Sequence, residues 1–175
     1  TERAKIPVMV CYDGFITSHS VENITLMENE EVKQFIGEYH PTEYLLDQIR
    51  NISLGPLAMQ KDYFVYRKEL ADAMKKSKEI ILDVSEEFYQ ITGRKYELFE
   101  EYQMEDAETA VVVLNSTAGT AKDTVDKLRT QGIKAGLIKP RTFRPLPYIE
   151  ITERLKHLKA LAIMDKCDSV NGYAA

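Results

Sequence analysis

The side chains with the most chemical potential lie together in one segment near the N-terminus, Asp13-Gly14-Phe15-Ile16-Thr17-Ser18-His19-Ser20. It directly follows an apolar run over residues 6–12, which is typical of a short strand, with Pro7 at its beginning. α/β proteins place ligands at polar, glycine-containing loops that follow the carboxyl end of a buried strand. This segment is therefore the first candidate for a ligand site.

The same segment has a simpler interpretation, in which a turn is followed by a capped helix. Asp13 and Ser18 would then bind backbone N–H groups close to them in the sequence. His19 does not decide between the two, because the sequence identifies no partner base, nucleophile or metal ligand for it. The residues alone leave both interpretations open.

A second loop with chemical potential covers residues 139–147, where three prolines make the chain stiff and extended. Arg141 and Arg144 project from it and could bind a phosphate or a carboxylate, because a guanidinium presents its donors as a planar fork. The alternative is that both arginines pair with acidic side chains at an interface.

Several motifs that would indicate chemistry do not occur in the sequence. It has no GxGxxG, GxxxxGK[ST] or GxSxG pattern, so neither nucleotide phosphate binding nor a nucleophile elbow has a motif. Cys11 and Cys167 lie far apart and form no CxxC pair, so we expect no iron–sulfur cluster, zinc site or disulfide in this chain. Both cysteines are expected to be buried, reduced thiols.

A strand–helix–strand unit is predicted over residues 110–138. The apolar run at residues 110–114 has no polar alternation, which is typical of a strand buried on both faces. Ser116 can cap a helix whose apolar residues recur at steps of three and four, and Gly132 would end it. A second apolar run at residues 135–138 completes a βαβ unit, whose crossover should be right-handed.

Before this unit the pattern is mainly helical. Residues 29–36 have the periodicity of a short helix, and residues 39–60 have none, which indicates an extended connector. The longest regular segment is a helix over residues 62–92, ended by Gly93. It could be broken near Ser77, or its apolar stripe could be a coiled-coil seam.

The acidic stretch at residues 97–106 is interpreted as a hinge or linker that leads into the βαβ unit. Downstream of the proline-rich loop, residues 148–159 are predicted to be a helix, and residues 160–164 a third buried strand that ends at Asp165. The predicted fold class is α/β, with a mainly parallel sheet and flanking helices, preceded by a strand, a connector and a long helix.

Composition excludes several classes of protein. The 175 residues are about one domain in length, and 44% of them are hydrophobic, which is enough for a core. The net charge of −5 argues against a nucleic-acid-binding surface. Since no apolar run of about 18 residues and no signal peptide occur, we expect no membrane contact and a cytoplasmic location. Both ends fall within predicted structure, so we expect a fragment of a longer protein.

The order of these motifs resembles the α subunit of the 2-oxoacid:ferredoxin oxidoreductases, most closely pyruvate:ferredoxin oxidoreductase. The resemblance covers nearly the whole chain. It rests on DGFITSH at residues 13–19, Gly55-Pro56 in the connector, Asp62-Tyr63-Phe64 at the start of the long helix, residues 110–119, and RTFRPLP at residues 141–147. The two loops at this spacing are its most specific part.

The resemblance implies a thiamine-diphosphate-dependent oxidoreductase that makes an acyl-CoA, CO2 and reduced ferredoxin from a 2-oxoacid, and pyruvate is the oxoacid we expect. Magnesium, coenzyme A and iron–sulfur clusters would belong to the full complex with its other subunits or domains. The family's thiamine-activating glutamate, diphosphate motif and cluster cysteines lie outside this chain. We therefore expect no catalytic residue and no bound cofactor or metal in this chain alone.

It also implies two parts with different roles. Residues 1–103 would be the end of the pyrimidine-binding domain with its connector and long helix, and residues 107–175 a truncated core domain II like the transketolase C-terminal domain, used mainly for assembly. Arg141 and Arg144 would form ion pairs at an interdomain or intersubunit interface. The residues nearest the cofactor or substrate, in an orienting role, would be Asp13, Gly14, Phe15, Thr17, Ser18 and His19.

Two other functions remain open. An α/β interaction module without an enzyme could use the acidic surface and long helix to dock a partner, although it would not need the two specific loops. Another thiamine-dependent enzyme, a transketolase or an oxoacid dehydrogenase, could share the same domain, and it would lack iron–sulfur clusters.

Overall fold

The structure is a computed structural model, and it describes residues 1–55 and 57–166. The chain divides into two compact units. One consists of Thr1–Ile6 and Asn23–Arg94 and is called the helical unit; the other consists of Pro7–Glu22 and the chain from Lys95 onward and is called the sheet unit.

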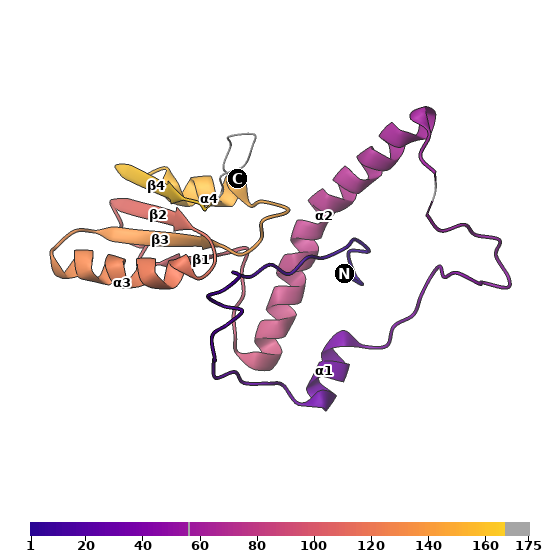
Figure 1. Cartoon of the computed structure of the whole chain (residues 1–175), viewed down its shortest axis with the longest axis horizontal. Helices are drawn as coiled ribbons and strands as arrows, with labels where there is room; N and C mark the ends of the chain where they lie inside the picture. Colours follow the sequence, from indigo (N-terminus) through magenta and orange to yellow (C-terminus); the bar gives the residue numbers. More distant parts are fainter. Residues whose placement is uncertain (56, 167–175) are drawn as a thin grey trace. The chain divides into compact units, whose positions relative to one another are not determined.

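In the described part of the chain, the sheet unit contains four strands and two helices (Figure 1). Their bounds are β1 Phe99–Tyr102, β2 Thr109–Val113, α3 Thr117–Thr130, β3 Ala135–Pro140, α4 Tyr148–Leu155 and β4 Ala160–Met164. The order across the sheet is β1-β3-β2-β4. β2 pairs in parallel with both β3 and β4, and only β1 runs antiparallel to its neighbour β3. The predicted α/β class with a mainly parallel sheet is confirmed.

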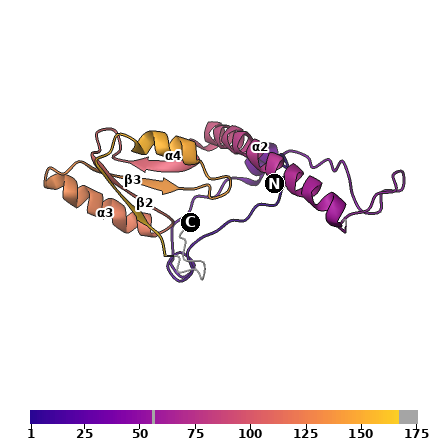
Figure 2. The same ribbon diagram turned by 90° about the horizontal axis from the view of Figure 1, so that it is seen from above.

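The two helices cover opposite faces of the sheet, as Figure 2 shows. Successive residues of the central strand β3 separate these faces, and both Leu137 and Ile138 are fully buried. Leu137 packs in a cluster with Val125 of α3, whereas Ile138 packs in a cluster that includes Ile151 of α4. The apolar runs on β2 and β3 exist because a parallel sheet is covered on both sides.

The end of α3 shows why a glycine stands there. Gly132 has a φ of 81°, in the left-handed region, and its N–H donates to the carbonyl of Arg129 at 3.0 Å. The next N–H, of Ile133, donates to the carbonyl of Leu128 at 3.1 Å. These two bonds form a Schellman motif, which satisfies carbonyls that the helix leaves unpaired. The predicted helix end at Gly132 is confirmed.

The helical unit contains α1 Asn29–Ile36 and α2 Gln60–Thr92, with a connector between them that has no regular secondary structure. α2 is one continuous helix of 33 residues, so the suggested break near Ser77 is wrong. It ends at Gly93, whose φ of 68° is left-handed, as predicted. Phe35 of α1 packs edge-on against Phe88 of α2, with ring centroids 5.7 Å apart.

The predicted linker at residues 97–106 is wrong, because it contains strand β1. Composition misled the prediction, since the acidic side chains of this edge strand have cationic partners within the sheet unit. Glu101 pairs with Arg154 at 2.8 Å, and Glu100 pairs with two cations described below. Charged side chains are common on edge strands because they discourage further strand pairing.

The predicted strand at residues 6–12 is also wrong. This segment has no regular secondary structure, and Met9 and Val10 are 86% and 84% exposed. A strand needs a neighbour to satisfy its backbone groups, and no strand in the described part of the chain pairs with this one. Cys11 is a free, exposed thiol, so its predicted burial is wrong, and Cys167 lies outside the described residues.

Two predictions near the C-terminal end need smaller corrections. The third strand exists as β4, but all five of its residues are exposed because it is an edge strand paired only with β2. The preceding helix α4 ends at Leu155, not at residue 159. None of the helices in residues 1–55 and 57–166 has the length and apolar character that a membrane crossing requires.

Candidate functional site

The Asp13 carboxylate lies at the N-terminal end of α3, although it is 103 residues away from its partner in the sequence. Asp13 Oδ2 accepts a hydrogen bond from the backbone N–H of Ser116 at 2.6 Å. Ser116 is the N-cap residue of α3, and its own side chain makes no capping hydrogen bond. The first N–H groups of a helix have no partner within the helix, and the positive end of its dipole favours a negative charge. Asp13 therefore caps α3 from a distant part of the chain.

A sharp turn presents the Ser116 N–H to this carboxylate. β2 ends at Val113 and α3 begins at Thr117, so the chain reverses within three residues. Asn115 takes a left-handed φ of 55° in this turn. Asparagine adopts that conformation more readily than most residues because its short amide can bond to the local backbone.

The loop that carries Asp13 is held by its own hydrogen bonds. The backbone N–H of Ser18 donates to the carbonyl of Asp13 at 3.2 Å, and the Ser18 hydroxyl accepts a bond from the N–H of Phe15 at 2.8 Å. The N–H of Ser20 donates to the carbonyl of Ile16 at 3.1 Å. Phe15 has a left-handed φ of 74° and an exposed ring. Residues 13–20, called the Asp13 loop below, thus form one hydrogen-bonded turn.

Ser18 also fixes the orientation of His19. The Ser18 Oγ lies 2.8 Å from His19 Nδ1, and the imidazole stacks on the Phe15 ring with centroids 5.3 Å apart. The contact with Ser18 and the stacking on Phe15 together hold the imidazole ring in one orientation.

Gly14 and Thr17 complete the set of residues predicted near a ligand, and both are exposed. Their backbone carbonyls accept hydrogen bonds from within the loop. The Gly14 carbonyl accepts one from the N–H of Ile16 at 3.0 Å, and the Thr17 carbonyl accepts one from the Ser20 hydroxyl at 3.3 Å. The interpretation as a local turn is right for Ser18, but Asp13 caps a distant helix and no helix directly follows the loop. The role of these residues near a cofactor stays a prediction.

The Asp13 carboxylate lies where the parallel strands β2 and β4 end. Ser116 follows β2, and Lys166 follows β4 with its positive charge close enough to act on Asp13. Hydrogen bonds from Ser116, then the charge of Lys166, hold the pKa of Asp13 below its ordinary value. The carboxylate is therefore ionised at neutral pH.

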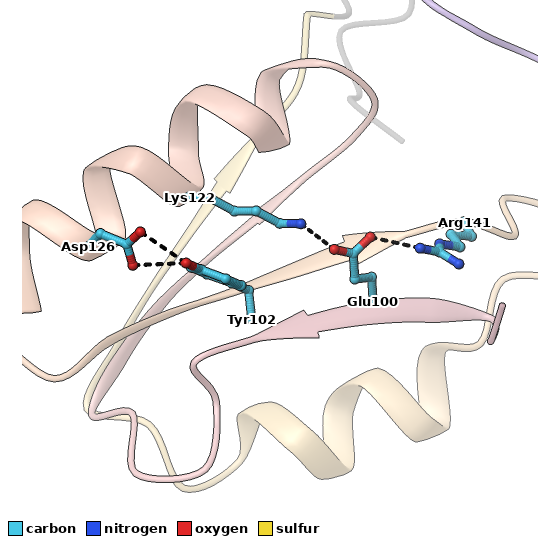
Figure 3. A network of polar contacts seen from close by, with 5 residues as sticks. All are labelled: Glu100, Tyr102, Lys122, Asp126 and Arg141. Atoms are coloured by element: carbon cyan, nitrogen blue, oxygen red, sulfur yellow. Dashed lines mark hydrogen bonds and ion pairs between the residues drawn. The ribbon is translucent and has the colours of Figure 1, made fainter. Parts of the chain in front are cut away.

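A second polar cluster, shown in Figure 3, lies between β1 and α3. Glu100 of β1 pairs with Lys122 of α3, and its second oxygen accepts a bond from Arg141 Nη2 at 2.8 Å. Beside them the Tyr102 hydroxyl donates to the Asp126 carboxylate at 2.9 Å. The bonds from Lys122 and then Arg141 lower the pKa of Glu100, while the bond to Asp126 raises the pKa of Tyr102.

The two arginines of the proline-rich loop differ in their surroundings. Arg141 pairs with Glu100, and its guanidinium lies 4.7 Å from the centroid of the Tyr96 ring, so its partners belong to its own unit. Arg144 is exposed and makes no ion pair with any residue of the described chain. An interface role for both residues stays a prediction, and Arg144 is the one whose charge is available for it.

Sequence patterns could not reveal the partners of either cluster. The bond between Asp13 and Ser116 joins distant segments, and no local pattern records it. Glu100 and Tyr102 were hidden in the acidic stretch taken as a linker, where the aromatic residues were the only indication of a strand. Within residues 1–55 and 57–166, no group of three His, Cys, Asp or Glu side chains could hold a metal ion.

Two family profiles match this chain over separate ranges. Residues 1–86 match the family described as pyruvate flavodoxin/ferredoxin oxidoreductase, thiamine diphosphate-binding, and residues 107–174 match pyruvate:ferredoxin oxidoreductase core domain II. The chain belongs to the pyruvate:ferredoxin oxidoreductase family. The resemblance stated from the order of the sequence motifs is thereby confirmed.

Curated relatives with this family's names align with nearly the whole chain. The pyruvate synthase subunit PorA of Methanocaldococcus jannaschii is 40% identical over 167 residues, which are 94% of this chain and 43% of the relative. PorA of Pyrococcus furiosus is 39% identical over 174 residues, 99% of this chain and 44% of the relative. The ketoisovalerate oxidoreductase subunit VorA of Pyrococcus abyssi is 36% identical over 166 residues, 94% and 42% of the two chains. This chain spans less than half the length of these relatives.

The Asp13 loop joins the two parts of this family that the profiles distinguish. Asp13 lies in the range matched by the thiamine diphosphate-binding profile, and Ser116 lies in the range matched by core domain II. In the structure both residues belong to the sheet unit. The loop thus belongs by sequence to one part of the family and by its contacts to the other.

Proposed function

We propose that this chain forms part of the α subunit of a thiamine-diphosphate-dependent 2-oxoacid:ferredoxin oxidoreductase that acts on pyruvate. The reaction would consume a 2-oxoacid and coenzyme A and yield an acyl-CoA, CO2 and reduced ferredoxin. The observation that carries the proposal is the match of two profiles of one family, in order, over nearly all of the chain. Relatives named as pyruvate synthase subunits support pyruvate as the oxoacid.

The chain would work as a component of a complex. Its curated relatives are named as subunits, which supports partnership with further subunits. Ferredoxin as electron acceptor, iron–sulfur clusters as carriers and a cytoplasmic location complete the proposal. Residues 1–103 would end the pyrimidine-binding domain, and residues 107–175 would form core domain II and serve mainly assembly.

Thiamine diphosphate, when bound, supplies the centre that stabilises the carbanion left by decarboxylation. As the resemblance implies, we expect the groups that hold the diphosphate, its magnesium, coenzyme A and the iron–sulfur clusters to lie elsewhere in the complex. We assign this chain no chemical step.

What this chain would contribute near the reaction is orientation. The Asp13 loop presents an imidazole that stacks on Phe15 and contacts the Ser18 hydroxyl, next to exposed Gly14 and Thr17. A ring N–H held in one orientation can donate a hydrogen bond to a carboxylate or carbonyl oxygen of a 2-oxoacid. This is a binding and orienting role for the loop, distinct from catalysis.

A second 2-oxoacid is a candidate substrate. The VorA subunit of a ketoisovalerate oxidoreductase is 36% identical to this chain, only slightly less than the PorA subunits. A branched-chain 2-oxoacid is therefore the alternative substrate within the same reaction class.

The test is a ferredoxin-reduction assay on the intact complex, purified without air through a tag on this chain. We expect reduction that requires both coenzyme A and an oxoacid, with a higher kcat/KM for pyruvate than for 2-oxoisovalerate. A reversed preference would keep the reaction and change the substrate. No reduction with any oxoacid would contradict the proposal.

A further inference from the structure

We propose that Asp13 is a positioning residue. Its carboxylate takes the place that open α/β sheets offer to an external ligand, and it thereby holds the Asp13 loop in a position to orient the oxoacid. The role toward the oxoacid rests on the proposed function, whereas the contact between Asp13 and Ser116 does not depend on it.

The first observation is the topology of the sheet. From β2 the chain goes through α3 to β3 on one side of β2, and from β3 it goes through α4 to β4 on the other side of β2. The strand order therefore changes direction at β2. Beyond the carboxyl ends of the strands at such a point, open α/β proteins bind their ligands, often with an anionic group at a helix N-terminus.

The second observation is that the Asp13 carboxylate occupies this position beyond the strand ends. Asp13 supplies the anionic group: Oδ2 lies 2.6 Å from the Ser116 nitrogen, at the start of the helix that follows β2. Lys166, after β4, adds a positive charge, and the Asn115 side chain is a further donor to the carboxylate. The chain's own carboxylate thus has the partners that a bound anion would have.

The third observation is how this anchor reaches the rest of the loop. The carbonyl of Asp13 accepts the N–H of Ser18, and Ser18 in turn contacts the Phe15 N–H and His19 Nδ1. Every step in this chain of contacts is a hydrogen bond within one turn. Releasing the carboxylate would free the turn from the start of α3, so His19 would lose its fixed position.

The test uses the intact complex with Asp13→Ala and Asp13→Asn. Asp47→Asn is the matched control, because Asp47 Oδ1 also accepts backbone bonds, from Ile49 at 2.9 Å and Arg50 at 3.2 Å, but belongs to the helical unit. Hydrogen exchange followed by mass spectrometry reports whether the contact between Asp13 and Ser116 holds the loop. Steady-state kinetics with pyruvate report whether the loop orients the substrate.

We expect Asp13→Ala to speed amide exchange in residues 13–20 and 115–118 roughly threefold or more, the scale of losing a helix cap. The KM for pyruvate should rise by a similar factor with kcat changed less, because the loop would orient substrate without taking part in chemistry. Asp13→Asn keeps an oxygen acceptor and should give smaller changes. Asp47→Asn should leave both readouts at wild-type values.

The ratio of variant to wild-type KM should stay constant between about pH 6 and 8, because the carboxylate, with its lowered pKa, is ionised throughout. Unchanged exchange in both segments would overturn the proposal, as would faster exchange with an unchanged KM. If the wild-type complex oxidises no 2-oxoacid, the proposed function fails, and the exchange result alone still decides whether Asp13 anchors the loop.

Discussion

Ser116 occupies the N-cap position of α3, but the capping acceptor comes from Asp13, 103 residues earlier in the chain. A local cap would stabilise only the helix. A distant carboxylate also fixes the segment that carries it, so the contact links the helix to the Asp13 loop. At the scale of single residues, the orienting role proposed for the Asp13 loop then depends on the polar atoms that hold its turn.

Ser18→Ala separates the turn's internal support from its anchor at Asp13. The change removes the acceptor of the Phe15 N–H and the partner of His19 Nδ1. Each lost bond is worth about 1 kcal/mol, so we expect the KM for pyruvate to rise about threefold to tenfold in the intact complex. Steady-state kinetics measure this rise.

Ser20→Ala is the matched control, because the Ser20 hydroxyl contacts only the Thr17 carbonyl and the exposed Glu22 carboxylate. Its KM should stay close to that of the wild type. Equal effects of the two substitutions would contradict a special role for Ser18.

Among the elements, β1 is the one that composition hid. Phe99 packs in the cluster on the α4 face, and Tyr102 packs against the cluster on the α3 face. Glu100 also contacts α3, through Lys122, and is only 24% exposed. Aromatic packing on both faces and ion pairs hold the strand in the sheet, although its acidic composition led to the prediction of a linker.

Glu100→Gln tests the ion pairs of β1. The lowered pKa of Glu100 means that the charged form stabilises the fold above the ordinary glutamate pKa, and that this stabilisation is lost as pH falls through the folded value. We expect the variant to be less stable by about 1 kcal/mol at neutral pH. Urea unfolding followed by circular dichroism would measure the difference.

This difference should begin to shrink as the pH falls through the ordinary glutamate pKa of about 4.3. It should disappear only below the lowered pKa of folded Glu100, where the wild-type side chain is itself protonated. A stability difference that does not change with pH would show that the charge of Glu100 contributes nothing.

Two glycines of the sheet unit should respond in opposite ways to alanine. A Cβ at Gly136 of β3 would lie 2.6 Å from Met104 Sδ and 2.9 Å from the Gln103 carbonyl oxygen, whereas a Cβ at Gly119 of α3 has no atom within 4 Å. Gly136→Ala should therefore destabilise the fold by about 1–3 kcal/mol. Gly119→Ala should stabilise it by up to about 1 kcal/mol, because alanine favours the helix.

The midpoint of urea unfolding for each variant would measure both effects. A Gly136→Ala variant as stable as the wild type would mean that β3 does not approach the Gln103 backbone as closely as the structure shows. A destabilised Gly119→Ala variant would contradict the argument from helix propensity.

On the scale of the whole molecule, the chain carries two family matches and spans less than half of its relatives' length. Many apolar side chains are exposed, including Val10 at 84% and Leu46 at 86%. Surfaces of this kind are typical of contacts with further protein. Assembly is therefore the property to measure at this scale.

Arg144→Glu should weaken assembly of the complex. Arg144 is exposed and has no ion-pair partner in the described chain, so reversing its charge would act on a partner outside it. Size-exclusion chromatography with light scattering should show partial dissociation. Lys127→Glu, an equal reversal on the exposed side of α3, is the control. Intact assembly of the Arg144 variant would contradict the interface role.

Sequence patterns predicted the sheet unit well where local rules decide. The apolar runs of β2 and β3 and the glycines that end α2 and α3 each depend on residues near them in the chain. Burial of a strand depends instead on distant neighbours. That is why residues 6–12 are not a strand and why β4 is exposed, although their compositions resemble that of β2.

The candidate site could be predicted only in part for the same reason. The types and spacing of residues 13–20 identified the loop, and a turn held by Ser18 follows from them. The partner of Asp13, and the pairing of Arg141 with Glu100, are contacts between distant segments. No pattern within a single segment contains that information.

The electron paramagnetic resonance spectrum of the intact complex, purified without air, tests the central claim most directly. If this chain is part of a pyruvate:ferredoxin oxidoreductase, adding pyruvate and coenzyme A together should produce signals of reduced iron–sulfur clusters, and omitting either should diminish them. The absence of clusters from the complex would contradict the account and favour another thiamine enzyme or a docking module.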